Sequence, residues 1–119
     1  MESGSIPDSN ITASSTLNSG TPAKNGRLNF AAGSSWCAAT SDSNPYLEID
    51  LQTLHFICAV STQGNSQADE WVETYTLQTS TDGTNWTDYT DDAGQVKVTY
   101  FTLLAKLSAL ILFQPYSLL

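Results

Sequence analysis

Apolar and polar residues alternate along several short segments of this chain. Residues 47–51 read Leu-Glu-Ile-Asp-Leu, and residues 73–80 alternate in the same way, with Tyr75 and Leu77 on one side. A period of two is typical of a half-buried β-strand. Residues 55–61 are almost continuously apolar, which predicts a buried central strand. Further strands are expected at 11–13, around 86–89 and at 96–100, with a looser alternation at 27–30.

Turn signals separate these segments at intervals of about 10 to 15 residues. Thr-Asp-Gly-Thr at 81–84 is a strong hairpin-turn signal, and Asp-Asp-Ala-Gly at 91–94 is a second turn. We expect Trp86, just after the first turn, to pack in the core. There is no helical periodicity before residue 100. The pattern therefore predicts an all-β fold, an antiparallel sandwich or barrel.

Charge narrows the possible partners. The chain has 119 residues, enough for one domain, with 12 acidic and 4 basic residues and a formal net charge of -8. Such a surface repels a phosphate backbone, which argues against nucleic-acid binding. Only 13% of the residues are charged, while Ser, Thr, Asn and Gly are abundant. This composition is typical of extracellular β-domains.

The composition changes sharply near residue 99. All 12 acidic residues lie within 1–98, and Leu occurs six times there but seven times in the 21 residues 99–119. We expect 1–98 to be the domain and 99–119 to be an unrelated apolar tail. The tail is short for a membrane-spanning helix, which needs about 20 largely apolar residues, and Lys106 interrupts it. No secretory signal is visible after Met1.

Catalytic patterns are almost absent. His55 is the only histidine and lies at the start of an apolar segment without a neighbouring nucleophile motif. Glu48 and Asp50 share one face of a predicted strand at period two, which favours a solvated face over an acid–base pair. The sequence therefore predicts a protein that is not an enzyme.

Eight segments, in order, resemble a known family. They are 1–15, Ala23 with 27–29, Trp-Cys-Ala at 36–38, 46–51, Ile-Cys-Ala-Val-Ser-Thr-Gln-Gly at 57–64, Trp-Val at 71–72, Tyr-Thr-Leu-Gln at 75–78, and Ser-Thr-Asp-Gly-Thr-Asn-Trp at 80–86. Together they resemble the discoidin domain, also called the coagulation-factor type C domain. The resemblance implies a jelly-roll-like, galactose-binding-like β-sandwich without catalytic activity. Members of this family bind collagen, glycans, phospholipid head groups or adhesion proteins through loops at one end, outside the cell or at its surface.

The resemblance covers residues 1–98 and stops where the composition changes. Family domains begin earlier, with a Cys, and continue 40 to 50 residues further, so the sequence predicts a domain truncated at both ends. Two alternatives to an adhesion module stay open. The first alternative is a fragment that has no binding function of its own. The second is a carbohydrate-binding appendage of a secreted enzyme.

The family's ligand loops correspond to residues 16–25, 33–44 and 65–70. Collagen-binding members carry an exposed Trp where this chain has Leu17, which weakens a collagen assignment and favours either an apolar contact at the loop tip or a partly buried residue. In the family, the residues matching Trp36 and Trp71 pack in the core. The expected ligand-binding residues are Thr16, Leu17, Asn18, Lys24, Asp42, Asn65 and Asp69, and Lys24 with Arg27 would meet an anionic lipid.

The remaining expected sites are a disulfide, two glycosylation sites and a calcium site. In one branch of the family the Cys at position 37 pairs with a partner that this chain lacks, so we expect a Cys37–Cys58 disulfide, with two free thiols as the alternative. No zinc spacing exists. Asn10 and Asn85 begin glycosylation sequons, although Trp86 puts the second in doubt. No cofactor is expected, and a calcium site formed by loop acids (Asp42, Asp69, Glu70) is only weakly signalled.

Overall fold

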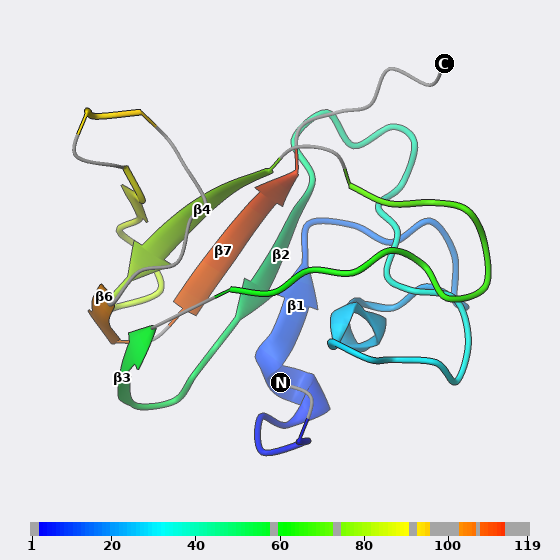
Figure 1. Ribbon diagram of the computed structural model, residues 1–119, viewed down its shortest axis with the longest axis horizontal. Coiled ribbons are helices and arrows are strands. Elements are labelled where there is room, and N and C mark those ends of the chain that lie inside the picture. Colours follow the sequence, from blue (N-terminus) through cyan, green and yellow to red (C-terminus); the bar gives the residue numbers. More distant parts are fainter. Residues whose placement is uncertain are drawn as a thin grey trace.

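The computed structural model describes residues 3–57, 60–72, 75–90, 93–95, 103–106 and 108–113. These residues form an all-β structure, as predicted, with two short 3-10 helices (Figure 1). The elements in chain order are η1 (Asp8–Asn10), β1 (Ile11–Ala13), η2 (Ala23–Gly26), β2 (Tyr46–Ile49), β3 (Leu54–Ile57), β4 (Tyr75–Ser80), β5 (Thr87–Asp88), β6 (Leu103–Lys106) and β7 (Ser108–Phe113).

The strands form two antiparallel sheets. The larger sheet has the order β1-β2-β7-β4-β5, and β3 pairs with β6 in the smaller one. Because neighbours in the larger sheet are far apart in sequence, its pairing depends on long-range contacts rather than on adjacent hairpins alone. Two pairs of consecutive strands lie side by side in that sheet: β1 and β2 are joined by a long connection, whereas β4 and β5 are joined by a short turn.

The core includes the apolar positions of the alternating segments, as predicted. On β2, Leu47 and Ile49 are buried while Tyr46 and Glu48 are half-buried. Ile49 packs in a cluster with Leu77 and Tyr89. The expected solvated face of β2 is only partly solvated: burial, with a smaller effect from the charge of nearby Asp50, raises the pKa of Glu48.

The largest difference from the sequence analysis concerns the C-terminal segment. Residues 99–119 were expected to be an unrelated tail, but they supply β6 and β7. Strand β7 is the middle strand of the larger sheet, where Ile111 is opposite both Leu47 of β2 and Leu77 of β4. The change in composition at residue 99 is therefore not the end of the described fold. A central strand that packs on a core carries apolar residues on its inner face, so an acid-free, Leu-rich segment is compatible with this position.

Three of the predicted strands either differ in the structure or lie outside the described residues. Residues 55–61 were expected to be a central strand, but β3 lies in the two-stranded sheet and His55 is exposed, with its Nε2 3.0 Å from Thr53 Oγ1. A continuous apolar run indicates burial without indicating sheet position. Residues 27–30 form turns, not a strand, with Asn29 at φ 60°. The strand expected at 96–100 lies outside the described residues.

The predicted hairpin turn at 81–84 is confirmed. Strands β4 and β5 pair on either side of it, with Gln78 opposite Asp88, and Gly83 adopts φ 72°. This left-handed conformation suits a residue without Cβ. Trp86, expected in the core, is half-buried.

Candidate functional site

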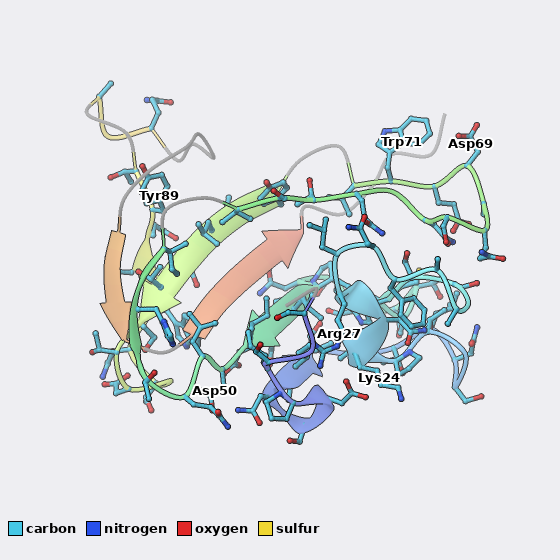
Figure 2. The ribbon with its side chains drawn as sticks, turned by 60° about the horizontal axis from the view of Figure 1, so that its bottom comes forward. Lys24, Arg27, Asp50, Asp69, Trp71 and Tyr89 are labelled. Atoms are coloured by element: carbon cyan, nitrogen blue, oxygen red, sulfur yellow. The ribbon has the colours of Figure 1, made fainter. Side chains whose placement is uncertain are left out.

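The three predicted ligand loops meet at one end of the molecule, on the right in Figures 1 and 2. The backbone N–H of Leu17 donates to the carbonyl of Cys37 at 2.8 Å, which joins loop 16–25 to loop 33–44. The N–H of Ser35 donates to Asn65 Oδ1 at 3.3 Å, which joins loop 33–44 to loop 65–70. The three loops therefore lie side by side, and we call them, together with Trp71 directly after the third loop, the loop end.

Asn25 joins the first two loops through its side chain. It is 6% exposed, and its Nδ2 donates to the carbonyls of Gly20 at 3.1 Å and Ser34 at 2.7 Å. A buried amide with both hydrogens engaged holds its partners in one geometry. The sequence analysis did not single out Asn25, because a polar residue in a Ser-, Thr- and Asn-rich loop carries no sign of burial.

Asn65 shapes the third loop. Its Oδ1 accepts from the N–H of Gln67 at 3.1 Å as well as from Ser35, and its Nδ2 donates to Glu70 Oε2 at 3.0 Å. Its backbone N–H donates to the Glu70 carbonyl at 2.8 Å. Asn65 was expected to contact ligand, but in the structure its polar atoms hold the loop.

Two large apolar side chains are exposed among the described residues, and both belong to the loop end. Leu17 is 46% exposed, as the loop-tip alternative proposed, and Trp71 is 56% exposed. The expectation that Trp71 packs in the core was wrong. It directly follows the loop closed by Glu70 and precedes the start of β4 at Tyr75, so it lies outside the sheet (Figure 2). Trp36 is half-buried, and its Nε1 donates to the carbonyl of Ser15 at 2.9 Å.

Asp42 fastens loop 33–44 to the end of β1. Its Oδ2 accepts from Ser14 Oγ at 2.6 Å and Ser15 Oγ at 2.5 Å, and its Oδ1 accepts from the N–H of Asn44 at 3.0 Å. These hydrogen bonds, the one from Ser14 first, hold the pKa of Asp42 below its usual range. The carboxylate expected to bind ligand is thus occupied by internal donors.

The remaining loop residues differ in their surroundings. Thr16 and Asn18 are exposed, and Asn18 Oδ1 accepts from the N–H of Gly20 at 2.8 Å within a turn. Asp69 is exposed at the tip of the third loop (Figure 2). Among the described residues no three His, Cys, Asp or Glu side chains gather as a metal site would require, so the calcium site stays a prediction.

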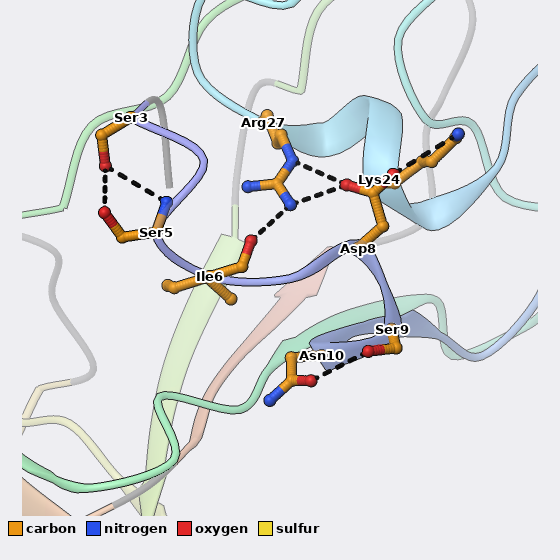
Figure 3. Close-up of polar contacts among 8 residues, drawn as sticks. All are labelled: Ser3, Ser5, Ile6, Asp8, Ser9, Asn10, Lys24 and Arg27. Carbon is orange, nitrogen blue, oxygen red and sulfur yellow. Dashed lines mark hydrogen bonds and ion pairs between the residues drawn. The ribbon is translucent and has the colours of Figure 1, made fainter.

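Lys24 lies on η2, where its charge is paired. Its Nζ is 3.4 Å from Asp8 Oδ2, and Arg27 Nη2 is 2.7 Å from Asp8 Oδ1 (Figure 3). Arg27 Nη2 also donates to the Ile6 carbonyl at 2.5 Å. The hydrogen bond from Arg27, followed by the contact with Lys24, lowers the pKa of Asp8. The two cations expected to meet an anionic lipid are therefore both paired with Asp8, and a contact with lipid stays a prediction.

Cys37 is exposed and carries a free thiol. Partial burial and the negative charge of Glu70 raise its pKa, which keeps the thiol protonated. Its expected partner, Cys58, lies outside the described residues. The structure thus has no bridge at Cys37, and the disulfide stays a prediction.

Comparison with known proteins identifies the family. The model of the F5/8 type C domain matches residues 10–110. The chain belongs to the F5/8 type C domain family. The matched range continues past residue 98, where the recognisable motifs ended, and includes β6 and the first half of β7.

Curated relatives agree with this assignment. The chain is 38% identical over 102 residues to human epithelial discoidin domain-containing receptor 1, with 80% of this chain and 11% of the receptor covered. It is 36% identical over 107 residues to mouse retinoschisin, with 84% of this chain and 48% of that protein covered. The chain therefore spans less than half of each of these relatives. F5/8 type C domains of this group are extracellular binding modules.

Solved structures show the same fold. Wild-type discoidin II from Dictyostelium discoideum superposes with a TM-score of 0.69 at 27% identity, covering 88% of this chain and 48% of that one. Chitosan-binding module 1 of a Paenibacillus chitosanase/glucanase has a TM-score of 0.56 at 19% identity, over 87% of this chain and 81% of the module. No helix in the described part of the chain is long and apolar enough to cross a membrane.

Proposed function

We propose that this F5/8 type C domain is an extracellular, non-enzymatic recognition module that binds its ligand at the loop end. One observation carries the proposal: Leu17 and Trp71, the large apolar side chains exposed among the described residues, both belong to loops that hydrogen bonds join into a single surface. Exposed apolar groups on a rigid frame are a common basis of recognition.

A neutral glycan is the ligand class that this surface fits best. A sugar ring has an apolar face that packs against an indole, and its hydroxyls pair with nearby polar groups. Around Trp71 such groups are available on exposed loop residues, among them Gln67 and Asp69. A matrix protein with an apolar side chain is the alternative that the test must separate.

Anionic phospholipid is the least favoured of the three expected ligands. The net charge of -8 repels an anionic surface. Lys24 and Arg27, which would have to overcome that repulsion, are both paired with Asp8. Phosphatidylserine vesicles should therefore bind the chain no better than phosphatidylcholine vesicles.

The test compares wild type with Leu17→Ala and Trp71→Ala on a glycan array, on both kinds of vesicle and on immobilised matrix proteins. Because central apolar contacts contribute most of the binding free energy, we expect each variant to weaken binding to the recognised probe by about tenfold or more. Circular dichroism checks that both variants keep the wild-type fold.

His55→Ala is the matched control, because His55 is exposed on β3, far from the third loop (Figure 1). It should bind as wild type does. Undiminished binding by both loop variants would contradict the proposed surface. A folded wild-type chain that binds none of the probes would contradict the recognition function itself.

A further inference from the structure

The two glycosylation sequons lie in very different surroundings. Each has the form Asn-x-Thr, Asn10-Ile-Thr12 and Asn85-Trp-Thr87, so the sequence does not distinguish between them. The sequence even favoured Asn10, because Trp86 follows Asn85. The contacts of the two asparagines reverse that order.

Asn10 is held on both sides of its amide. It is the last residue of η1, it is half-buried, and its Oδ1 accepts from Ser9 Oγ at 3.1 Å. Its Nδ2 faces Asp50 Oδ2 at 3.4 Å, and its backbone carbonyl accepts from the N–H of Asp50 at 2.8 Å. The half-buried position of Asn10 and its backbone hydrogen bond, next to the pairing of β1 with β2, leave less room for a sugar on Nδ2 than an exposed turn does.

Asn85 lies in the turn between β4 and β5, and only one hydrogen of its amide nitrogen is needed for a hydrogen bond in that turn. It is exposed, and its Nδ2 donates to Asp82 Oδ2 at 2.7 Å. Asp82 Oδ1 separately accepts from the N–H groups of Thr84 and Asn85, each at 2.8 Å. An amide nitrogen has two hydrogens, so one can be replaced while the other still donates to Asp82. The hydroxyl residues of the two sequons, Thr12 and Thr87, are both exposed, so it is the asparagines that distinguish the two sites.

We propose that Asn85 is the N-glycosylation site of this chain and that Asn10 is not modified. The inference uses the extracellular location of the proposed function, because the donor is a lipid-pyrophosphate-linked oligosaccharide of the secretory pathway. Asn85 Nδ2 forms a bond to C1 of the first sugar and loses one proton to a base. The bond between C1 and the pyrophosphate oxygen breaks, and the lipid pyrophosphate leaves with the electron pair.

The position of Asn85 gives the modification a physical role. Asn85 lies just before β5, the outermost strand of the five-stranded sheet on that side. An outer strand offers backbone hydrogen-bonding groups to other chains, and proteins protect such edges from unwanted pairing. A bulky, hydrated oligosaccharide next to β5 shields that edge.

The test expresses the full chain behind a cleavable secretion signal in a eukaryotic cell line. Intact mass and peptide mapping before and after peptide N-glycosidase treatment then locate the sugar. We expect the oligosaccharide on Asn85 alone. It should be lost in Asn85→Gln and in Thr87→Ala, but kept in Asn10→Gln and in Thr87→Ser, which retains the sequon.

Any oligosaccharide on Asn10, or a secreted chain whose mass the glycosidase leaves unchanged, would overturn the proposal. Thr87→Ala leaves Asn85 in place, so its loss of sugar separates the sequon requirement from any folding effect of replacing the asparagine. Because the readout is a mass, it is independent of whether the loop end binds a ligand. Failure here is therefore distinguishable from failure of the proposed function.

Discussion

Side chains at the loop end differ in whether they hold the loops together or are exposed to solvent. Three polar side chains form hydrogen bonds with backbone groups and neighbouring side chains: Asn25, Asn65 and Asp42. Two apolar side chains, Leu17 and Trp71, are exposed. The first group positions the loops and the second is available to a ligand. Residue type alone predicts the opposite, because polar loop residues look like ligand contacts and a tryptophan looks like core.

Replacing Asn25 by Asp tests this positioning role. A carboxylate there has no hydrogen to donate and faces the carbonyl oxygens of Gly20 and Ser34. We expect Asn25→Asp to lower the free energy of unfolding by about 2 kcal/mol or more. Urea denaturation followed by circular dichroism measures the change.

Asn18→Asp is the control for added charge in the same loop. Asn18 is exposed and uses Oδ1 as an acceptor for the N–H of Gly20, a role that a carboxylate retains. This variant should unfold near the wild-type midpoint. Equal losses in the two variants would show that charge, and not the buried amide, accounts for the effect.

At the level of elements, one acidic side chain, Asp82, accepts several of the hydrogen bonds that hold the turn of the β4–β5 hairpin. Asp82 accepts hydrogen bonds from the backbone of Asn85 and Thr84, from the Asn85 side chain and from the Ser80 hydroxyl. The backbone N–H of Asn85 contributes most to holding the pKa of Asp82 well below its usual range. The ionised form of Asp82 therefore contributes to the stability of the hairpin, beside the Ser80 hydroxyl and the pairing of β4 with β5.

The stability that Asp82 contributes should depend on pH. Its pKa is lower in the folded state than in the unfolded chain, so its contribution is complete above about pH 4 and declines as the pH falls toward the folded value. We expect Asp82→Asn to melt at a lower temperature than wild type at pH 7. The difference should narrow progressively below about pH 4.

Thermal melts at a series of pH values provide this measurement. Asp69→Asn, which removes an acid from an exposed loop, is the control and should melt as wild type does at pH 7. A difference between Asp82→Asn and wild type that stayed constant from pH 7 to pH 2 would contradict a role for the ionised carboxylate.

At the scale of the whole molecule, the sheet depends on its C-terminal strand. Strand β7 lies between β2 and β4 and pairs with both, so without it the larger sheet divides into β1-β2 and β4-β5. Two-stranded sheets are marginally stable in water.

Shortening the chain tests that dependence. We expect the 119-residue chain to unfold in one cooperative thermal transition and a chain ending after residue 102, without β6 and β7, to show none. A chain ending after Phe113 keeps every described strand and is the matched control. A cooperative transition in the shorter chain would show that β7 is dispensable.

The amino-acid sequence predicts the fold class, the positions of β1 to β5, the hairpin at 81–84 and, through the family resemblance, three loops that are expected to bind ligand. It could do so because alternation, turn residues and family motifs are local properties of the chain. It did not determine the partners of β3, the central place of β7, the exposure of Trp71 or the burial of Asn25. Those depend on which distant segments pair and on which polar groups find partners across loops, and only the tertiary structure decides such contacts.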